Sequence, residues 1–327
     1  MAEAENITMT IEEPTTGKKS FLETLRENKT IGDSTFNLYV SNLIRLNEGQ
    51  VPKNLNFLKN TEAITAKIEK YKPNTQRTYY IGIVSLLKDV PKFKKVFDFY
   101  YDRMMNLNKE LKTNTTKSDT QKENWVNQED VKTLHSTITE EVRPLLEKKK
   151  LSGTEYEKLL RWLVLSLYTL QPPRRNADYQ FCIVVNKWTP SLDTKYNYYD
   201  LTTGTFYLNN YKTKKTYSTQ EIKAPEELET VIKSYLKHHP LKAELKKKSG
   251  AIPLLTDYNG DPFESINSIT RILNKVFGKR VGVSLLRNIY LTDKYSDKVD
   301  ELKDDAEAMG TSQNTILNNY VKVNETS

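Results

Sequence analysis

Apolar residues in the first third of the chain recur at the spacing of amphipathic helices. In the segment 32–49 they fall at i, i+3, i+4 and i+7 between Phe36 and Leu43, which places them along one face of a helix. The same spacing recurs twice more before residue 110. We therefore predict about four helices between residues 18 and 110.

Two polar segments flank this helical region. The N-terminal stretch 1–17 is polar and acidic and has no apolar centre, so it predicts a disordered leader rather than a secretory signal. The stretch 111–125 lacks periodicity and is rich in Lys, Thr and Asn, which predicts a linker between two domains. The chain is long enough for two, because domains commonly run roughly 100–200 residues. The second domain is expected to span residues 126–327.

The hydrophobic pattern of the second half changes from helical to extended and back. A strongly apolar helix is predicted up to Leu170, because Pro172 and Pro173 cannot continue it. Short apolar and Tyr-rich runs then predict strands, with a turn at Thr203-Gly204. These runs cover residues 181–185, 196–211 and 216–225. Helical patterns return afterwards, so the predicted fold is mainly α with a small antiparallel β-sheet in the C-terminal domain.

The composition of the chain indicates a polyanionic partner. The chain has 50 Lys and Arg against 42 Asp and Glu, a net charge of +8 and a pI near 9.1. Basic residues cluster at 147–150, 211–215 and 245–248, although each run alone also fits an ordinary solvated face. No apolar stretch reaches the roughly 18 residues that a membrane span needs. We therefore expect nucleic acid rather than a membrane as the partner.

Cysteine and histidine are scarce. The single cysteine, Cys182, lies in an apolar run and can form no internal disulfide, which favours a small core residue and an intracellular protein. Of the three histidines, His238 and His239 are adjacent and point to different sides of a helix. A His-based metal site is therefore not expected.

Three separated segments carry candidate chemistry. The first has Arg174 and Arg175 after the proline-terminated helix, the second has Arg287 within an apolar helix, and the third has Tyr320 near the C-terminus. Each also has an ordinary interpretation: an exposed basic turn, an arginine that extends to solvent, and one of 20 tyrosines. Their order and spacing carry more weight than any one of them.

Taken together, these segments resemble the catalytic domain of the tyrosine recombinases, the phage integrase family. Arg175 followed by Asp178 is similar to the family's first arginine and its acidic neighbour, with Asp where Glu is usual. The family next has a lysine on a β-hairpin, and Lys212 matches it better than Lys214 or Lys215 does. The resemblance thus implies a catalytic arginine and a proton-donating lysine at one site.

The second arginine motif and the tyrosine follow in the family's order. Ser284 stands in place of the histidine in the family's His-x-x-Arg motif, Arg287 is kept, and Asn288 is expected to help fix the arginine. Thr311 stands for the histidine of a Met-Gly-His stretch, and Tyr320 lies nine residues after it, which is the family's spacing for the nucleophile. Neither Ser284 nor Thr311 takes up a proton near pH 7 as imidazole does, but both can donate a hydrogen bond.

The resemblance extends to the whole architecture. Residues 18–110 resemble the helical, SAM-like core-binding domain that the family places before its catalytic domain, here residues 126–327. Within the first domain, Thr75 and Arg77 can reach DNA phosphates, or Thr75 can simply cap a helix on which Arg77 is exposed. Both interpretations remain open. Further candidate DNA contacts are Arg174, Lys214 and Lys215.

The residue types suit attack on a phosphodiester. Two arginines hold the non-bridging oxygens in a fixed fork and keep their charge at any working pH. A tyrosine nucleophile conserves the energy of the broken bond in a 3′-phosphotyrosyl link, so rejoining needs no ATP. A lysine can protonate the leaving 5′-hydroxyl. The resemblance therefore implies an enzyme that uses no metal and no other cofactor.

The resemblance implies a site-specific recombinase or integrase of a viral or mobile element. It would act on double-stranded DNA as a homotetramer through a Holliday junction, inside a cell and, if viral, in the host nucleus or cytoplasm. Seven residues follow Tyr320, so the family's exchange of a C-terminal helix between protomers would be short, or made by the helix that carries Tyr320. A type IB topoisomerase and a catalytically degenerate DNA-binding protein of the same fold remain as alternatives.

Overall fold

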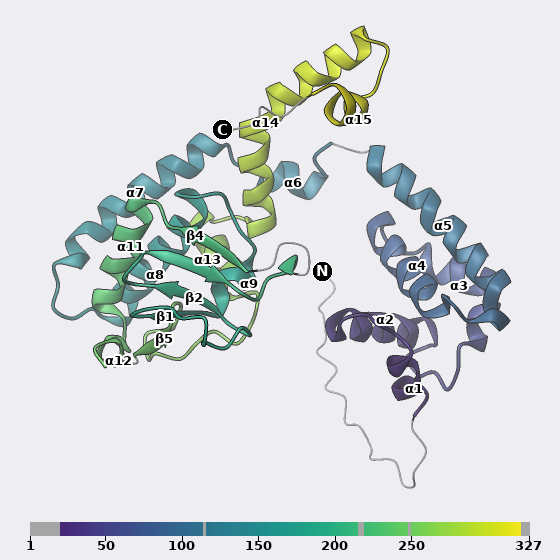
Figure 1. The fold of residues 1–327 in the computed structure, drawn as a ribbon, viewed down its shortest axis with the longest axis horizontal. Helices are drawn as coiled ribbons and strands as arrows, with labels where there is room; N and C mark the ends of the chain where they lie inside the picture. The colour runs from purple at the N-terminus through teal and green to yellow at the C-terminus, as the bar shows by residue number, and fades with distance from the viewer. Residues whose placement is uncertain (1–19, 114–115, 215–218, 248–249, 322–327) are drawn as a thin grey trace. The chain divides into compact units, whose positions relative to one another are not determined.

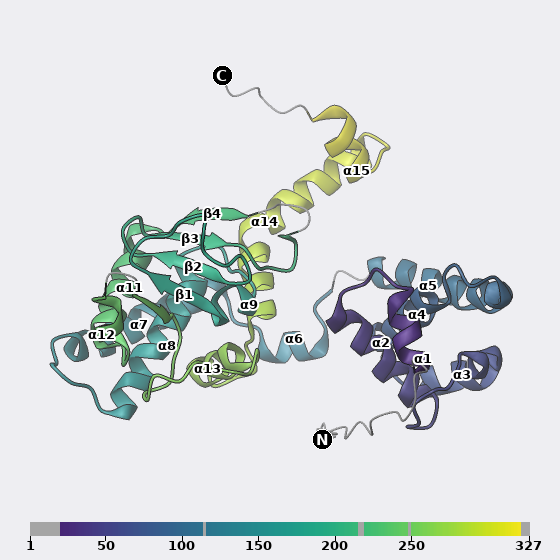
Figure 2. The same ribbon diagram turned by 60° about the horizontal axis from the view of Figure 1, so that its bottom comes forward.

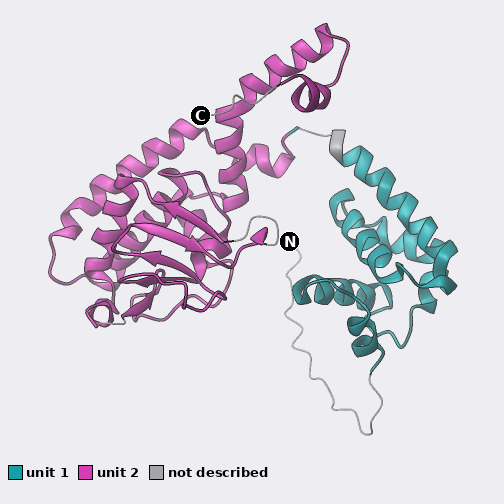
Figure 3. Cartoon of the chain, viewed as in Figure 1, with its two compact units in different colours: residues 1–116 teal, residues 117–327 magenta. Residues whose placement is uncertain are grey.

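The protein divides into two compact units, residues 1–116 and 117–327, which are described separately (Figure 3). The computed structural model describes residues 20–113, 116–214, 219–247 and 250–321. The predicted leader, 1–17, lies outside the described residues. The boundary between the units falls within the stretch 111–125 that the sequence predicts as a linker.

Unit 1 consists of helices joined by short loops (Figure 1). The helices are α1 (Phe21–Glu27), α2 (Asp33–Leu46), α3 (Thr61–Ile68), α4 (Pro73–Leu87) and α5 (Lys94–Thr113), with 3₁₀ turns η1 (Asn56–Lys59) and η2 (Pro91–Phe93). The predicted apolar stripe lies on α2, where Phe36, Val40 and Leu43 are buried. Because α4 packs against both α2 and α5, these three helices build the core of the unit.

Unit 2 combines helices with a five-stranded sheet (Figures 1 and 2). Before the sheet come α6 (Asp119–Asn124), α7 (Gln128–Leu146), α8 (Gly153–Thr169) and α9 (Asn176–Gln180). The strands are β1 (Cys182–Val185), β2 (Asn197–Asp200), β3 (Thr205–Leu208), β4 (Gln220–Lys223) and β5 (Ala251–Pro253). The remaining helices are α11 (Glu226–His238), α12 (Lys242–Leu245), α13 (Ser268–Phe277), α14 (Val283–Ala308) and α15 (Gln313–Thr315), followed by the π-helical turn η3 (Ile316–Tyr320).

Helix α8 forms the centre of the core of unit 2. Its apolar residues point in several directions, and Leu159, Leu163, Val164 and Leu165 are all fully buried. Helices α7, α11 and α13 pack around it, which explains why every residue from 162 to 168 is buried. Cys182 in β1 is buried in the same core, in agreement with its interpretation as a core residue, and this burial raises the pKa of its thiol.

The sheet is mixed, so the prediction of an antiparallel sheet is wrong. The strand order is β4-β3-β2-β1-β5, and β1 pairs with β2 in parallel while the other pairs are antiparallel. The predicted turn at Thr203-Gly204 does join the antiparallel strands β2 and β3. The connection 186–196, in contrast, runs back from the end of β1 to the level of its first residue, so that β2 starts beside the start of β1. A parallel pair requires such a return. Local alternation does not report the direction of a partner strand, and β5 was not predicted.

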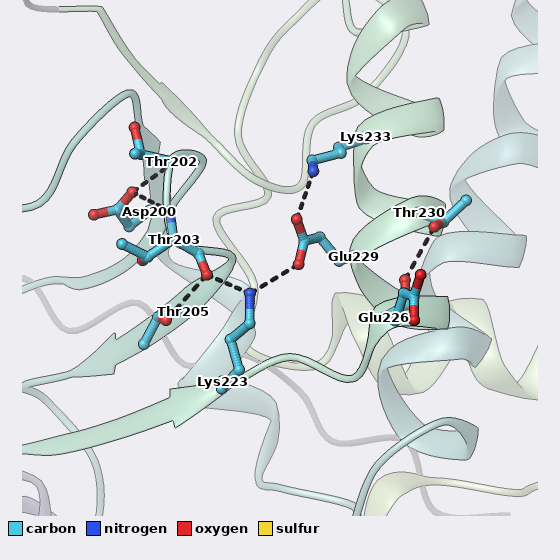
Figure 4. Close-up of polar contacts among 9 residues, drawn as sticks. All are labelled: Asp200, Thr202, Thr203, Thr205, Lys223, Glu226, Glu229, Thr230 and Lys233. Atoms are coloured by element: carbon cyan, nitrogen blue, oxygen red, sulfur yellow. Dashed lines mark hydrogen bonds and ion pairs between the residues drawn. The ribbon is translucent and has the colours of Figure 1, made fainter.

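A polar network holds the turn between β2 and β3 against α11 (Figure 4). The Asp200 carboxylate accepts a hydrogen bond from the Thr203 N–H at 3.0 Å. Lys223 Nζ donates to the Thr203 carbonyl and, at 2.9 Å, to the Glu229 carboxylate. Gly204 has a φ of 64°, and a Cβ there would lie 2.4 Å from a Glu229 oxygen. The turn therefore favours glycine for its backbone conformation, and a Cβ would also displace the ends of the Glu229 and Lys223 side chains.

A buried hydrogen-bonded cluster links α8, α11 and the segment after β5. Tyr156 Oη lies 2.6 Å from Tyr235 Oη and 3.0 Å from Thr256 Oγ1. His239 is fully buried; its Nδ1 accepts from the Leu241 N–H at 3.1 Å, and its Nε2 lies 3.3 Å from Thr256 Oγ1. Desolvation lowers the pKa of His239 to about 4. The imidazole is therefore neutral in the folded protein at neutral pH.

The buried His239 is expected to make the fold less stable in mild acid. In the unfolded chain its imidazole protonates below about pH 6.5, whereas in the folded protein it protonates only near pH 4. Its contribution is therefore complete above about pH 6.5 and lost as the pH falls, by about 1.4 kcal/mol per unit. Between about pH 7.5 and pH 5, urea unfolding should show wild type losing about 2 kcal/mol more than His239→Gln. Equal losses of unfolding free energy in the two proteins would show that His239 is not buried as a neutral imidazole.

Candidate active site

Four predicted catalytic residues line one open cavity in unit 2. Arg175 comes from the start of α9, Lys212 from the segment between β3 and β4, and Ser284 and Arg287 from the start of α14. The cavity has a volume of about 810 Å³. These residues lie on three segments far apart in the sequence, so the fold brings them together rather than local chain geometry.

The cavity is strongly basic. Its described lining includes four cationic side chains, those of Arg175, Lys195, Lys212 and Arg287, and no aspartate or glutamate. Cations without carboxylates beside them attract an anion, and arginine forks suit phosphate oxygens in particular. Lys195 was not predicted as a site residue. The sequence indicates it only as a basic residue just before the Tyr-rich strand β2.

The start of α9 places Arg175 at the cavity wall. Two prolines end the path of α8, and Arg175 then acts as the N-cap of α9 with extended backbone at φ −79° and ψ 156°. The next residue, Asn176, donates hydrogen bonds to the Ile266 carbonyl at 3.2 Å and to Thr270 Oγ1 at 3.0 Å. These bonds tie α9 to α13 and its preceding loop, and they hold Arg175 in a half-buried position.

A buried asparagine connects the arginine segment with the lysine segments. Asn197 Nδ2 donates to the Asp178 carbonyl at 3.1 Å and to the Asn210 carbonyl at 3.0 Å, and Asn197 Oδ1 accepts from the Asn210 N–H at 2.7 Å. Asn210 in turn donates from its side chain to the Lys195 carbonyl at 2.9 Å. The backbone beside Lys212 and that of Lys195 are thereby fixed relative to α9.

The predicted DNA contact Arg174 is engaged within the protein. Its Nε donates to Asp178 Oδ2 at 2.9 Å and its Nη2 to Gln220 Oε1 at 2.9 Å. Its guanidinium also lies over the Tyr211 ring, 5.7 Å from the centroid. Arg174 therefore links α9 to both ends of the segment that carries Lys212. The predicted supporting residue Asp178, which is 1% exposed, anchors this link.

Asp178→Ala is expected to lower the free energy of unfolding by about 2–4 kcal/mol, because Arg174 would lose the partner of a largely buried ion pair. Urea unfolding followed by circular dichroism measures this change. Glu140→Ala is the matched control, since it removes the exposed pair between Glu140 and Arg143. That control should change stability by less than about 1 kcal/mol. Equal losses from the two substitutions would contradict a structural role for the buried pair.

The first turns of α14 present Ser284 and Arg287 on one face. The two residues are three positions apart in a helix, which places their side chains on the same side. Val283 and Leu286 are buried in the core and fix the rotation of the helix about its axis. Asn288, which was predicted to support Arg287, is exposed and makes no hydrogen bond with it in the described structure.

The predicted nucleophile does not lie at the cavity. Helix α14 runs for 26 residues, with Arg287 near its start and Ala308 at its end. At 1.5 Å per residue, the helical path between these two residues is roughly 30 Å. Thr311 and Tyr320 come after this path, and Figures 1 and 2 show α14 extending away from the sheet with α15 at its far end.

The C-terminal segment folds back onto the end of α14. Gln313 Nε2 donates to the Val299 carbonyl at 3.3 Å, and Ile316 and Ala306 are buried. Tyr320, in η3, is 62% exposed. We call residues 291–321 the C-terminal arm, and Tyr320 is exposed to solvent on it.

The other predicted DNA contacts are not among the described lining residues of the cavity. Lys214 is half-buried and does not line it, while Lys215 lies outside the described residues. In unit 1, Thr75 is exposed in the first turn of α4. Arg77, on the same helix, donates from Nε to the Asn108 side chain on α5. Arg77 is thus partly occupied by a contact within unit 1.

Comparison with known proteins gives no match: no protein-family model, no curated protein and no solved structure matches this chain. Within the described ranges, no group of three or more His, Cys, Asp or Glu residues could hold a metal ion. No helix in those ranges is long and apolar enough to cross a membrane. The basic cavity is therefore the feature of the described structure that indicates a function.

Proposed function

We propose that the protein is a tyrosine recombinase that cleaves and rejoins double-stranded DNA. The observation that carries the proposal is the basic cavity, where Arg175, Lys212, Ser284 and Arg287 converge without a lining carboxylate among the described residues. Their order along the chain is that of the family's first arginine, its lysine and its His-x-x-Arg motif. A phosphodiester is the ligand that two arginine forks and a lysine suit best.

In the proposed reaction, the scissile phosphate binds between Arg175 and Arg287, whose guanidinium groups neutralise the charge that grows on the non-bridging oxygens. Ser284 donates a hydrogen bond to the phosphate from the face it shares with Arg287. The Tyr320 hydroxyl loses its proton to water and attacks phosphorus, and the bond from phosphorus to the 5′-oxygen breaks. Lys212 protonates that oxygen, which leaves a 3′-phosphotyrosyl link and a free 5′-hydroxyl. Rejoining is the reverse sequence.

The position of Tyr320 favours action between chains. The C-terminal arm carries exposed apolar side chains at i, i+4 and i+8, those of Leu291, Tyr295 and Val299. Residues 291–310 contain seven acidic residues and three lysines, a net charge of −4, so DNA phosphates repel this part of the arm. An acidic, partly apolar arm is suited to a basic protein surface. We therefore assign it to a neighbouring copy, within the proposed homotetramer, whose cavity it supplies with Tyr320.

Covalent trapping tests the proposed function. A pool of nicked duplexes with randomised sequence around the nick should yield a protein–DNA adduct that survives denaturation, because the short cleaved fragment diffuses away. Tight binding without an adduct on any duplex would instead favour a DNA-binding protein without catalysis. Relaxation of supercoiled DNA by a monomer, without junction formation, would favour a type IB topoisomerase.

A further inference from the structure

The basic cavity also has an apolar wall, which the proposed reaction does not use. Among the described residues of the range 117–290, four large hydrophobic side chains are exposed, and three of them line this cavity. These three, which we call the apolar wall, are Phe181 and Tyr196, each 44% exposed, and Ile266, which is 52% exposed. Single exposed apolar side chains are ordinary on a protein surface, but their concentration at one cavity indicates a binding surface.

The sheet brings the two aromatic residues of the apolar wall together. Phe181 and Tyr196 directly precede Cys182 and Asn197, which are partners in the parallel pair of β1 and β2. Adjacent strands lie roughly 4.7–4.9 Å apart, so the two side chains start from neighbouring backbone positions. Neither ring pairs with another aromatic ring among the described residues. Their faces are therefore left for a ligand.

Hydrogen bonds to the main chain hold the apolar wall in place. The Tyr196 carbonyl accepts from Nδ2 of Asn209, a residue that is 2% exposed, at 3.1 Å. The Ile266 carbonyl accepts from Asn176 Nδ2, and this bond also holds the segment that carries Arg175. The apolar wall and the first arginine of the cavity are thereby fixed relative to each other, as a ligand with both an anionic and an apolar part requires.

The chemistry of the cavity matches that of a nucleotide. Four cationic side chains and no carboxylate are among the described lining residues. The volume of about 810 Å³ falls within the roughly 300–1,000 Å³ of pockets that enclose an organic ligand, which is more than one phosphate group fills. A nucleotide has an anionic phosphate for the cations and a flat base for the aromatic rings. Aromatic side chains stack on bases of any sequence, because every base has a π-face.

The position of the apolar wall distinguishes an unpaired nucleotide from a paired one. In a duplex, the faces of each base are covered by the neighbouring base pairs. An aromatic side chain reaches such a face only after the nucleotide has left the stack. This step costs least where the nucleotide is mismatched or already single-stranded. Rings that lie in the same cavity as phosphate-binding cations therefore suit an unstacked nucleotide.

We propose that the basic cavity binds an unpaired nucleotide beside the scissile phosphate, with its base against the apolar wall. The inference rests on the proposed function for the identity of the polymer as DNA. The end of the C-terminal arm is a competing occupant, but residues 311–321 contain no charged residue and do not neutralise the four cations. The substrate class is therefore DNA with an unstacked nucleotide at the cleavage site, as in a bulge, a mismatch or a single strand.

Two short strands of equal charge test this base site. A thymidine hexanucleotide and an abasic strand of the same length carry the same phosphates and differ only in their bases. Full-length wild type should bind the thymidine strand roughly tenfold more tightly, because only that strand has bases to stack on the rings. Fluorescence anisotropy at one fixed salt concentration measures both Kd values, and a fixed salt concentration keeps the phosphate contribution equal.

Variants of the apolar wall assign the preference to its rings. Phe181→Ala and Tyr196→Ala should each reduce the ratio of the two Kd values to less than about threefold, whereas Tyr196→Phe should keep the wild-type ratio because the ring remains. Tyr258→Ala is the matched control, since Tyr258 is also 44% exposed in unit 2 and does not line the basic cavity. A wild-type ratio near one, or a tenfold ratio that persists in both alanine variants, would overturn the base site.

These measurements need no cleavage, so they separate the base site from the proposed reaction. A wild-type adduct without a preference for the thymidine strand would overturn the base site alone. A preference without an adduct on any duplex would support the base site and overturn the proposed reaction. Tighter binding of a uridine RNA strand than of the thymidine strand would contradict the assignment to DNA. If the alanine variants lose self-association but keep the wild-type ratio, the apolar wall binds a second copy of the chain and the base site is wrong.

Discussion

A mixture of Tyr320→Phe and Arg287→Ala chains is expected to form the covalent DNA adduct that neither variant forms alone. The first variant keeps the basic cavity and lacks the proposed nucleophile. The second keeps that tyrosine and lacks one of the two arginines proposed to bind the phosphate. Because roughly 30 Å of helix separates Arg287 from Ala308 at the end of α14, the intact cavity of one chain can receive the tyrosine of the other. The adduct should therefore lie on the Arg287→Ala chain.

A size tag on one variant identifies the chain that carries DNA on a denaturing gel. Tyr101→Phe is the control, since Tyr101 is an exposed tyrosine of unit 1, and this variant should form the adduct as wild type does. An inactive mixture beside an active wild type would show that the arm returns to the cavity of its own chain, contrary to our proposal. An adduct formed by Tyr320→Phe alone would assign the nucleophile to another residue.

Arg175→Ala and Arg287→Ala are each expected to slow adduct formation by about 10²- to 10³-fold, because each removes a preorganised donor from the phosphate oxygens in the transition state. Replacement by lysine should restore little of the rate, since an ammonium group cannot make the two parallel hydrogen bonds of a guanidinium. Single-turnover rates on the nicked duplex at saturating protein measure the chemical step apart from DNA binding.

Arg271 provides a matched control for the two arginines. It lies on α13 in the same unit, is exposed and does not line the basic cavity. Arg271→Ala should leave the rate within about twofold of wild type. If Arg175→Ala and Arg287→Ala also stayed within about tenfold, the two guanidinium groups would not be stabilising the reacting phosphate.

Many elements of the fold could be predicted because their signals are local. The apolar stripe from Phe36 to Leu43 predicts α2, the prolines after Leu170 predict the end of α8, and Thr203-Gly204 predicts the hairpin of β2 and β3. Helical period, proline geometry and turn chemistry all act within a few residues. The mainly helical fold is accordingly confirmed.

Contacts between distant segments could not be predicted in this way. The parallel pairing of β1 with β2, the entry of Lys195 into the cavity and the inward turn of Arg174 toward Asp178 each depend on partners that no local pattern reports. Which side chains meet at a site depends on how the helices and strands pack, and packing brings together residues that are far apart in the sequence.

The same distinction between local and distant contacts applies to the candidate site. By itself, the sequence determined the order of Arg175, Lys212 and Arg287 and the nine-residue spacing from Thr311 to Tyr320. Only the tertiary structure decided that the cations share one cavity while the tyrosine stands on an arm. The physical reason is that α14 continues without interruption for 26 residues, and its steady rise carries Tyr320 away from the arginine at its start.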